Sequence, residues 1–144
     1  MILVSNLAEE MSKLADGAVE VAENSYKLIL NYSVDSLKNT EEIFTSLHKE
    51  VPKNFLAKIS KRGLTEEQIN LAALMLGAYV GEVIRRIHGG EWIREDVMGE
   101  KDVITLKLNG SSIFPVGKAY KRIKNGSEDD ICFYYKVLTT EILK

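Results

Sequence analysis

The chain has 144 residues, of which 45% are hydrophobic and 28% are charged, and this composition predicts a single globular domain over residues 1–144. The net charge of −2 favours neither nucleic acid nor an anionic membrane as a partner. The single cysteine excludes an internal disulfide and fits a reducing compartment, so we expect a cytoplasmic protein.

The amino-terminal segment predicts one helix followed by one short strand. Ser5 or Asn6 can cap the helix, which ends near Asn24. The β-prone run Tyr26–Leu30 then predicts a strand. No basic region precedes the first apolar residues of the chain, so we do not expect a secretory signal.

Two further helices are expected before the middle of the chain. The first begins at Ser33 and is broken by Val51-Pro52, because the residue before a proline disfavours the helical conformation. A short helix then ends at Gly63. Its apolar residues are Phe55, Leu56 and Ile59.

The segment from Thr65 to His88 predicts a long central helix. Thr65 and Gln68 form a capping box at its start, and Gly89-Gly90 can close its end. Helical spacing places three small residues on one narrow strip, where another element can approach the backbone closely. These are Ala73, Gly77 and Gly81.

Apolar residues surround this strip on all sides. They are Leu71, Leu74, Met75, Leu76, Tyr79 and Val80. A helix that is apolar all round is buried either in a protein core or in a membrane. The uncharged run between Asn70 and Glu82 is far shorter than the roughly 20 residues that a membrane span needs, so we expect a core helix and no membrane partner.

The carboxy-terminal half predicts a small sheet. Glu91–Glu95 and Val103–Leu108 are typical of strands, and the turn Asn109-Gly110 leads into a third strand, Ser111–Phe114. We expect an antiparallel meander that the early strand Tyr26–Leu30 joins at one edge.

Two helices complete the chain. The first begins at Pro115, runs through Ile123 and ends at Asn125-Gly126. The second starts at Ser127, where three acidic residues complement the helix dipole. The predicted fold class is α+β, with a long buried central helix and flanking helices packed on a small, mainly antiparallel sheet.

Several short segments resemble an uncharacterised bacterial α+β family that is known as a domain of unknown function. They are Asn31-Tyr32-Ser33, Ser36-Leu37, Gly77–Arg86, Gly89–Trp92 and Pro115 with Lys121–Gly126. The most specific part is the pattern Gly-x-x-x-Gly-Glu followed by Gly-Gly-x-Trp. The resemblance implies a bacterial origin and the same fold class, and it transfers no activity or site residue.

The best candidate site lies at the carboxy-terminal end of the central helix. Tyr79, Glu82 and Arg86 fall within about 60° of one another on the helix. One interpretation is a polar pocket in which Glu82 and Arg86 bind a ligand or an anion, with His88 and Trp92 beside it. The other is an internal i,i+4 ion pair between Glu82 and Arg86 that lets a buried helix end in water, with Trp92 in the core.

Other reactive residues favour structural roles. His48 and His88, the two histidines, lie near predicted helix ends, where each can serve as a cap. Cys132 is expected to be buried filler, and the acids before it raise its pKa. The basic helix over Lys118–Lys124 is interpreted as a solvated face, because the acids that follow it cancel its charge.

No catalytic signature is present in the sequence. Glycine-rich phosphate loops, nucleophile elbows and metal-ligand spacings are all missing, so we expect no cofactor and no metal. The leading hypothesis is a non-enzymatic protein-binding domain of the immunity or accessory type, whose partner is another protein. The alternatives are a small-ligand-binding domain or enzyme at the end of the central helix, and nucleic-acid binding through Lys118–Lys124.

Overall fold

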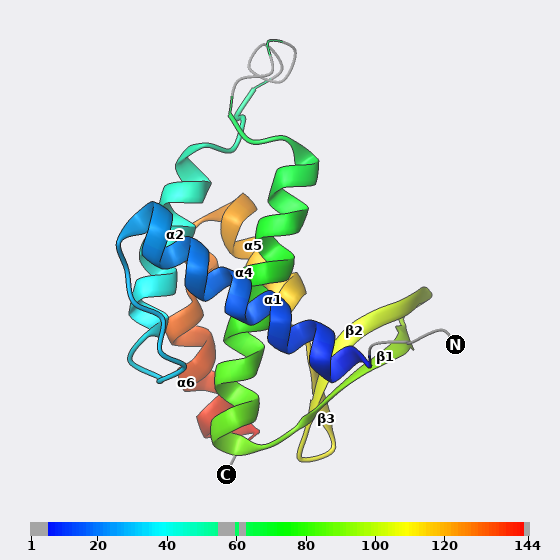
Figure 1. Cartoon of the computed structure of the whole chain (residues 1–144). Helices are drawn as coiled ribbons and strands as arrows, with labels where there is room; N and C mark the ends of the chain where they lie inside the picture. The colour runs from blue at the N-terminus through cyan, green and yellow to red at the C-terminus, as the bar shows by residue number, and fades with distance from the viewer. Residues whose placement is uncertain (1–5, 55–59, 61–62, 143–144) are drawn as a thin grey trace, which may run out of the picture.

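Helix α4 (Glu66–His88) forms the centre of the structure, and the other elements are arranged around it (Figure 1). The computed structural model describes residues 6–54, 60 and 63–142. The other helical elements are α1 (Leu7–Val21), the π-helical turn η1 (Ala22–Tyr26), α2 (Leu37–Lys49), α5 (Pro115–Asn125), the 3-10 turn η2 (Ser127–Asp129) and α6 (Ile131–Glu141). The strands are β1 (Glu91–Val97), β2 (Glu100–Leu108) and β3 (Ser111–Ile113). This α+β architecture confirms the predicted fold class.

Local hydrogen bonds fix both ends of α4 where the sequence predicts them. The Thr65 hydroxyl accepts from the Gln68 backbone N–H at 3.1 Å, and the Gln68 side chain accepts from the Thr65 N–H at 2.9 Å. At the other end the Gly89 N–H donates to the Arg85 carbonyl at 2.8 Å, and Gly89 has a φ of 89°, which favours glycine. The chain therefore leaves the helix at Gly89 and turns into β1.

The glycines of α4 allow α5 and β1 to approach its backbone. A Cβ atom on Gly77 would lie 2.5 Å from the Cα of Val116, at the start of α5. A Cβ atom on Gly81 would lie 2.2 Å from the Cη2 atom of Trp92 on β1. The predicted close packing along this strip is confirmed, because neither position has room for a side chain.

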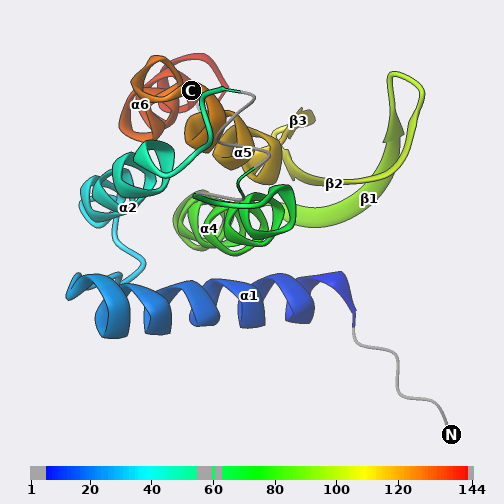
Figure 2. The same cartoon turned by 90° about the horizontal axis from the view of Figure 1, so that it is seen from above.

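The burial of α4 is less uniform than its apolar sequence predicts. Residues 76–84 are buried without interruption, but Leu71 is 56% exposed and Ile87 is also exposed. The expectation that the helix is wrapped on all sides is therefore wrong for its ends. The physical reason is the layered packing: α1 and α5 cover the middle of α4 on opposite sides, and the helix extends beyond them (Figures 1 and 2).

The sheet has three antiparallel strands in the order β1-β2-β3. Trp92 pairs with Leu106, and Leu108 pairs with Ser111 across the turn. Asn109 and Gly110 have φ values of 48° and 77°, as the predicted two-residue turn requires. The strands β1 and β2 continue beyond β3 as a hairpin that curves away from α4, toward the side where α5 lies (Figure 2).

The predicted early strand is wrong. Helix α1 continues into η1, and Lys27 then takes a left-handed conformation with a φ of 57°. Tyr26 and Leu30 pack against the core without pairing with any strand in the described part of the chain. Burial of Leu30 and partial burial of Tyr26 and Leu28 override the strand preference of this run, whereas Ile29 is exposed.

Two helix starts also differ from the prediction. The turn over residues 33–36 precedes α2, which begins at Leu37 and not at Ser33. The acids after Ser127 form η2, and α6 begins only at Ile131, with the Asp130 side chain accepting from the Phe133 N–H at 2.8 Å. The expected short helix with Phe55, Leu56 and Ile59 lies outside the described residues.

Candidate functional site

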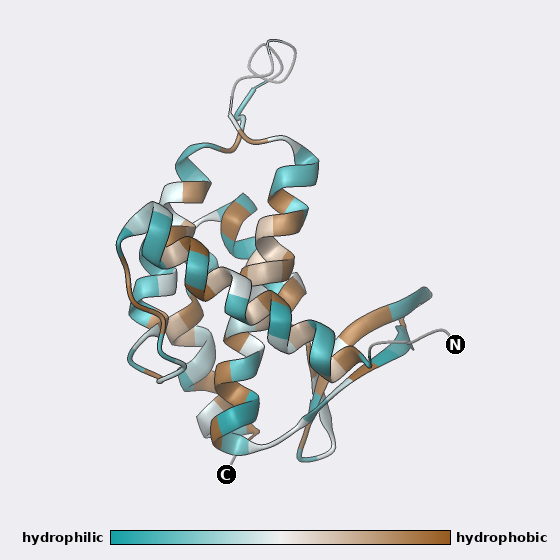
Figure 3. Ribbon diagram, viewed as in Figure 1, coloured by the Kyte–Doolittle hydropathy of each residue, from teal (hydrophilic) through white to brown (hydrophobic). Residues whose placement is uncertain are grey.

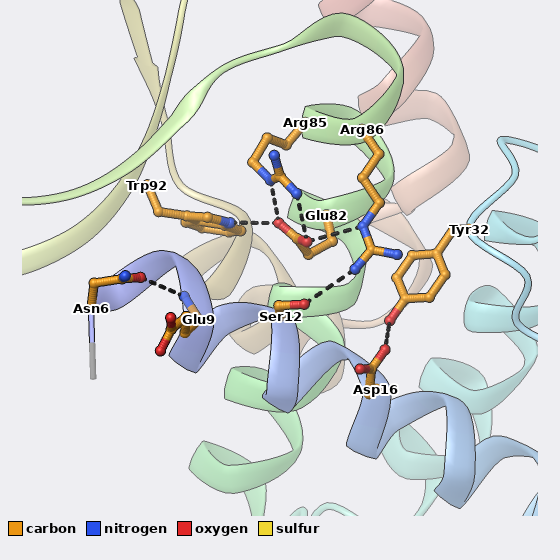
Figure 4. A network of polar contacts seen from close by, with 9 residues as sticks. All are labelled: Asn6, Glu9, Ser12, Asp16, Tyr32, Glu82, Arg85, Arg86 and Trp92. Carbon is orange, nitrogen blue, oxygen red and sulfur yellow. Dashed lines mark hydrogen bonds and ion pairs between the residues drawn. The ribbon is translucent and has the colours of Figure 1, made fainter. Parts of the chain in front are cut away.

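Glu82 is the centre of a polar cluster at the carboxy-terminal end of α4 (Figure 4). Its side chain is fully buried. Arg85 donates to both carboxylate oxygens, at 2.6 and 3.0 Å, and Arg86 donates to one of them at 3.0 Å. The indole N–H of Trp92 donates to the other oxygen at 2.8 Å. We call Glu82, Arg85, Arg86 and Trp92 the Glu82 cluster.

Both local sequence and the fold assemble this cluster. The i,i+3 and i,i+4 spacings bring Arg85 and Arg86 to the side of Glu82 on one helix. The turn at Gly89-Gly90 returns the chain along α4, so that the Trp92 ring covers Gly81 and its N–H meets the carboxylate. The sequence predicted the Glu82–Arg86 pair, and the structure confirms it. Arg85 was missed, although its i,i+3 spacing was a signal.

Arg86 connects the cluster to the amino-terminal part of the chain. Its guanidinium group donates to the Ser12 hydroxyl on α1 at 3.3 Å and lies 3.7 Å from the centre of the Tyr32 ring. The Tyr32 hydroxyl in turn donates to Asp16 at 2.5 Å. The contacts of Arg86 with Ser12 and Tyr32 join segments more than fifty residues apart, and no local sequence pattern could have predicted them.

Tyr79 belongs to the same network without touching Glu82. Its hydroxyl accepts from the Tyr32 backbone N–H at 2.8 Å and shares a hydrogen bond of 2.5 Å with the Ser36 hydroxyl. Burial raises the pKa of Tyr79, so the phenol stays protonated. Tyr79 therefore fastens the loop before α2 to the central helix.

The electrostatics of the cluster keep Glu82 ionised. Burial by itself raises the pKa of this carboxyl, but the hydrogen bonds from Arg85 and Trp92 and the positive charges nearby outweigh it, so that the pKa lies below its ordinary value. The carboxylate is thus a charged group with several donors directed at it. A group in this state holds a structure together and is a poor general base.

The five predicted site residues do not form one site. Three of them meet at the Glu82 carboxylate, one is connected to them indirectly, and one has a different partner. Glu82, Arg86 and Trp92 are in direct contact, and Tyr79 joins them through Tyr32. His88 lies apart, because its Nε2 atom is 2.5 Å from the Tyr135 hydroxyl on α6.

The other reactive residues have structural partners. The Nδ1 atom of His48 lies 2.7 Å from the Ile123 carbonyl, so His48 caps α5 and not its own helix. Burial raises the pKa of Cys132, and Asp130 adds to the effect, in the direction that the sequence predicted.

The basic helix α5 is not the fully solvated face that we expected. Arg122 is buried and pairs with Glu41 of α2 at 3.0 Å. The amphipathic winding of α5 directs this residue inward, where Glu41 compensates its charge and also accepts from the Ile131 N–H at 2.8 Å. Lys118 and Lys124 pair with Asp129 and Glu66.

Two neighbouring surface grooves lie on the α5 side of the structure. The first, which we call the hairpin groove, has a volume of about 860 Å³ and lies between the β1–β2 hairpin, α4 and α5. Its apolar lining includes Ala73, Val97, Met98, Ile104, Phe114 and Val116. Its charged lining residues are Arg94, Glu100, Asp102 and Lys121.

The second groove, of about 450 Å³, lies between β3, α5 and α6, and we call it the α6 groove. It is lined by Tyr134, Val137 and Leu138 of α6, and it shares Phe114, Gly117 and Lys121 with the hairpin groove. No member of the Glu82 cluster lines either groove. Any site for a partner in these grooves is therefore separate from the cluster.

None of the described helices combines the length and the apolar character needed to cross a bilayer. No group of three or more histidine, cysteine, aspartate or glutamate side chains among the described residues is placed to hold a metal ion.

The protein is thus an α+β domain with an exposed β-hairpin and two surface grooves. Residues 54–135 match the family described as Domain of unknown function (DUF3806). The match covers more than half of the chain, so the chain belongs to this family. No curated protein and no solved structure matches the chain. Every residue that lines the hairpin groove lies inside the matched segment.

Proposed function

We propose that this protein is a non-enzymatic protein-binding domain of the immunity or accessory type, which contacts its partner through the hairpin groove. The bacterial cytoplasm is part of this proposal and is supported by the family resemblance and the single cysteine. The observation that carries the proposal is Met98, a completely exposed apolar side chain at the end of the projecting hairpin.

Met98 is unusual for its backbone conformation as well as for its exposure. It has a φ of 48° and is followed by Gly99 at 89°, in the turn between β1 and β2. Turns of this kind favour Asn-Gly, as at Asn109-Gly110. A methionine here costs about 1 kcal/mol relative to a residue that tolerates the left-handed region, and it gains no burial. Binding explains the residue better than folding does, because a flexible thioether adapts well to a partner surface.

The groove beside Met98 has the composition of a protein interface. Val97, Ile104 and Val116 form an apolar centre, and Phe114 is 37% exposed beside them. Figure 3 shows that β2 is hydrophobic along its middle and hydrophilic near its outer end. An apolar centre with a charged rim is the usual anatomy of an interface between proteins.

The Glu82 cluster supports an internal role. Its carboxylate is bonded from three sides, so the contacts within the chain account for its burial without a ligand. The alternative is that a small ligand binds at this end of α4. Thermal-shift screening tests it, because a ligand that binds only the folded state raises the midpoint temperature of unfolding.

Site-specific photocrosslinking tests the proposed function. Met98 is replaced by a photoreactive phenylalanine derivative in the natural host cells, and Lys38, an exposed residue of α2, is replaced in the same way as the matched control. We expect one discrete protein adduct from position 98, none of equal intensity from position 38, and loss of the adduct when Phe114→Ser is added. No adduct at position 98, or equal adducts at both positions, would contradict the proposal.

A further inference from the structure

We propose that the partner is a protein segment in which an acidic side chain is flanked by apolar ones, and that Lys121 selects it. The segment crosses α5 at Gly117, with its apolar side chains in the hairpin groove and the α6 groove. This inference rests on the proposed function and specifies what the surface recognises.

The two grooves form one surface because they share residues of α5. Both are lined by Phe114, which directly precedes α5, and by Gly117 and Lys121 within the helix, with about one turn between successive residues. A bound segment can therefore occupy both grooves only by passing over this part of α5.

Gly117 leaves the passage between the grooves open. It lies inside α5 and is exposed, and of the described residues a Cβ atom there would meet only the Cβ of Phe114, at the ordinary contact distance of 3.7 Å. Gly77, by contrast, has no room for a side chain. Glycine inside a helix costs about 1 kcal/mol relative to alanine, and packing among the described residues does not require it at position 117. A partner that lies against the helix at this point accounts for the glycine.

Lys121 is the basic residue of α5 that folding leaves without a carboxylate partner in the described part of the chain. Lys118, Arg122 and Lys124 each form an ion pair. Lys121 lies near Asp129, but the Asp129 carboxylate is already bonded by Lys118 and by Asn125. Lys121 lines both grooves together with apolar side chains, and its ammonium group is available to an incoming carboxylate.

The surrounding charges favour one carboxylate over a polyanion. Glu100 and Asp102 line the hairpin groove near its outer end, Arg94 lines it as well, and the α6 groove is lined by Asp129 and Glu141 together with Lys118. These acids would repel the successive phosphates of a nucleic acid. A peptide with one acid between apolar residues avoids them and still meets Lys121.

Selection from a phage-displayed library of random dodecapeptides tests this inference. Selections on the wild-type chain should enrich peptides with Asp or Glu between large apolar residues. Lys121→Glu should bind these peptides about tenfold more weakly or worse, and its own selection should prefer Lys or Arg at the same position. Gly117→Gln should weaken binding while keeping the helix, because glutamine is a good helix former.

Two further variants serve as controls. Lys13→Glu makes the same charge change on α1, on the opposite side of α4 from α5, and should leave peptide binding unchanged (Figure 2). Phe114→Ser tests the groove itself and should abolish binding. Unchanged far-UV circular dichroism and thermal midpoints show that each variant is folded.

The outcomes separate the inference from the proposed function. If Phe114→Ser abolishes binding but Lys121→Glu selects the same peptides as the wild type, the inference is wrong and the proposed function stands. If Phe114→Ser leaves binding unchanged, both are contradicted. If no peptide is enriched, the inference is wrong, and the photocrosslinking result decides the proposed function. A dimer in solution that Phe114→Ser dissociates would also overturn the inference, because a second copy would then occupy the grooves.

Discussion

Replacing Gly77 by alanine tests whether the close approach of α5 to α4 holds the fold together. Alanine is better than glycine inside a helix by about 1 kcal/mol, so helix propensity alone predicts a more stable protein. The tertiary contact predicts the opposite. The new Cβ would lie 2.5 Å from the Cα of Val116 and 2.9 Å from the Pro115 carbonyl oxygen.

The size of the effect follows from which atoms must move. The neighbours of Gly77 are backbone atoms, so a change of rotamer cannot relieve the overlap, and the start of α5 must shift by about 1 Å to restore ordinary contact. Overpacking of this kind costs about 3 kcal/mol at the upper end of its usual range. After subtraction of the gain in propensity, we expect Gly77→Ala to lower the free energy of unfolding by about 2 kcal/mol.

Gly17 in α1 is the matched control. A Cβ there would lie 3.0 Å from the terminal methyl of Met75, which can move aside, so Gly17→Ala should be neutral or stabilising by up to about 1 kcal/mol. Urea unfolding followed by circular dichroism measures both variants. A loss of 2 kcal/mol lowers the midpoint by about 1 M at a typical slope. A Gly77→Ala midpoint at or above that of the wild type would refute the reasoning.

The remaining predictions concern buried charges and the hairpin turn. Glu82→Gln should lower the free energy of unfolding by about 2 kcal/mol, measured in urea at pH 7, because it removes a charge from hydrogen bonds with two arginines. Since the pKa of Glu82 is lowered from 4.5, its stabilisation is present above that pH and is lost as the pH falls through the folded value. The wild type should therefore lose more stability than Glu82→Gln on acidification, and equal losses would contradict this sign. Arg122→Met should cost about 3 kcal/mol by leaving Glu41 unpaired, and an unchanged thermal midpoint would show that the pair contributes little. Met98→Asn should raise the thermal midpoint, because asparagine tolerates the positive φ, while removing an anchor for the partner; a lower midpoint would argue against strain at this turn.

Several features of the fold were predictable because they depend on local contacts. The capping box Thr65–Gln68 and the closing glycine Gly89 fix the ends of α4 through hydrogen bonds within five residues. The turn at Asn109-Gly110 was predictable for the same reason, because its positive φ values restrict which residues fit. The pair Glu82–Arg86 follows from helical spacing alone.

Two predictions were wrong where the burial of side chains decided the structure. The run Tyr26–Leu30 has strand-like residues, but it begins in a helical turn, and Tyr26, Leu28 and Leu30 pack against the core without a strand partner in the described part of the chain. Arg122 belongs to a basic segment that the sequence predicts to be solvated, but its side chain is buried and pairs with Glu41 of α2. In both cases the deciding contacts are made with residues far away in the chain. A local sequence pattern contains no information about such contacts.

The sequence by itself determined the ends of α4 and α5, the turn at Asn109-Gly110 and the ion pair on α4, because each depends on neighbours within one or two helical turns. Only the tertiary structure decided that Trp92 completes the Glu82 cluster, that Met98 projects into solvent, and that Lys121 lacks a carboxylate partner among the described residues where its basic neighbours have one. The exposure of a side chain and the pairing of its charge depend on which elements pack beside it. The same lysine-rich segment can therefore be paired or unpaired according to which helices lie next to it.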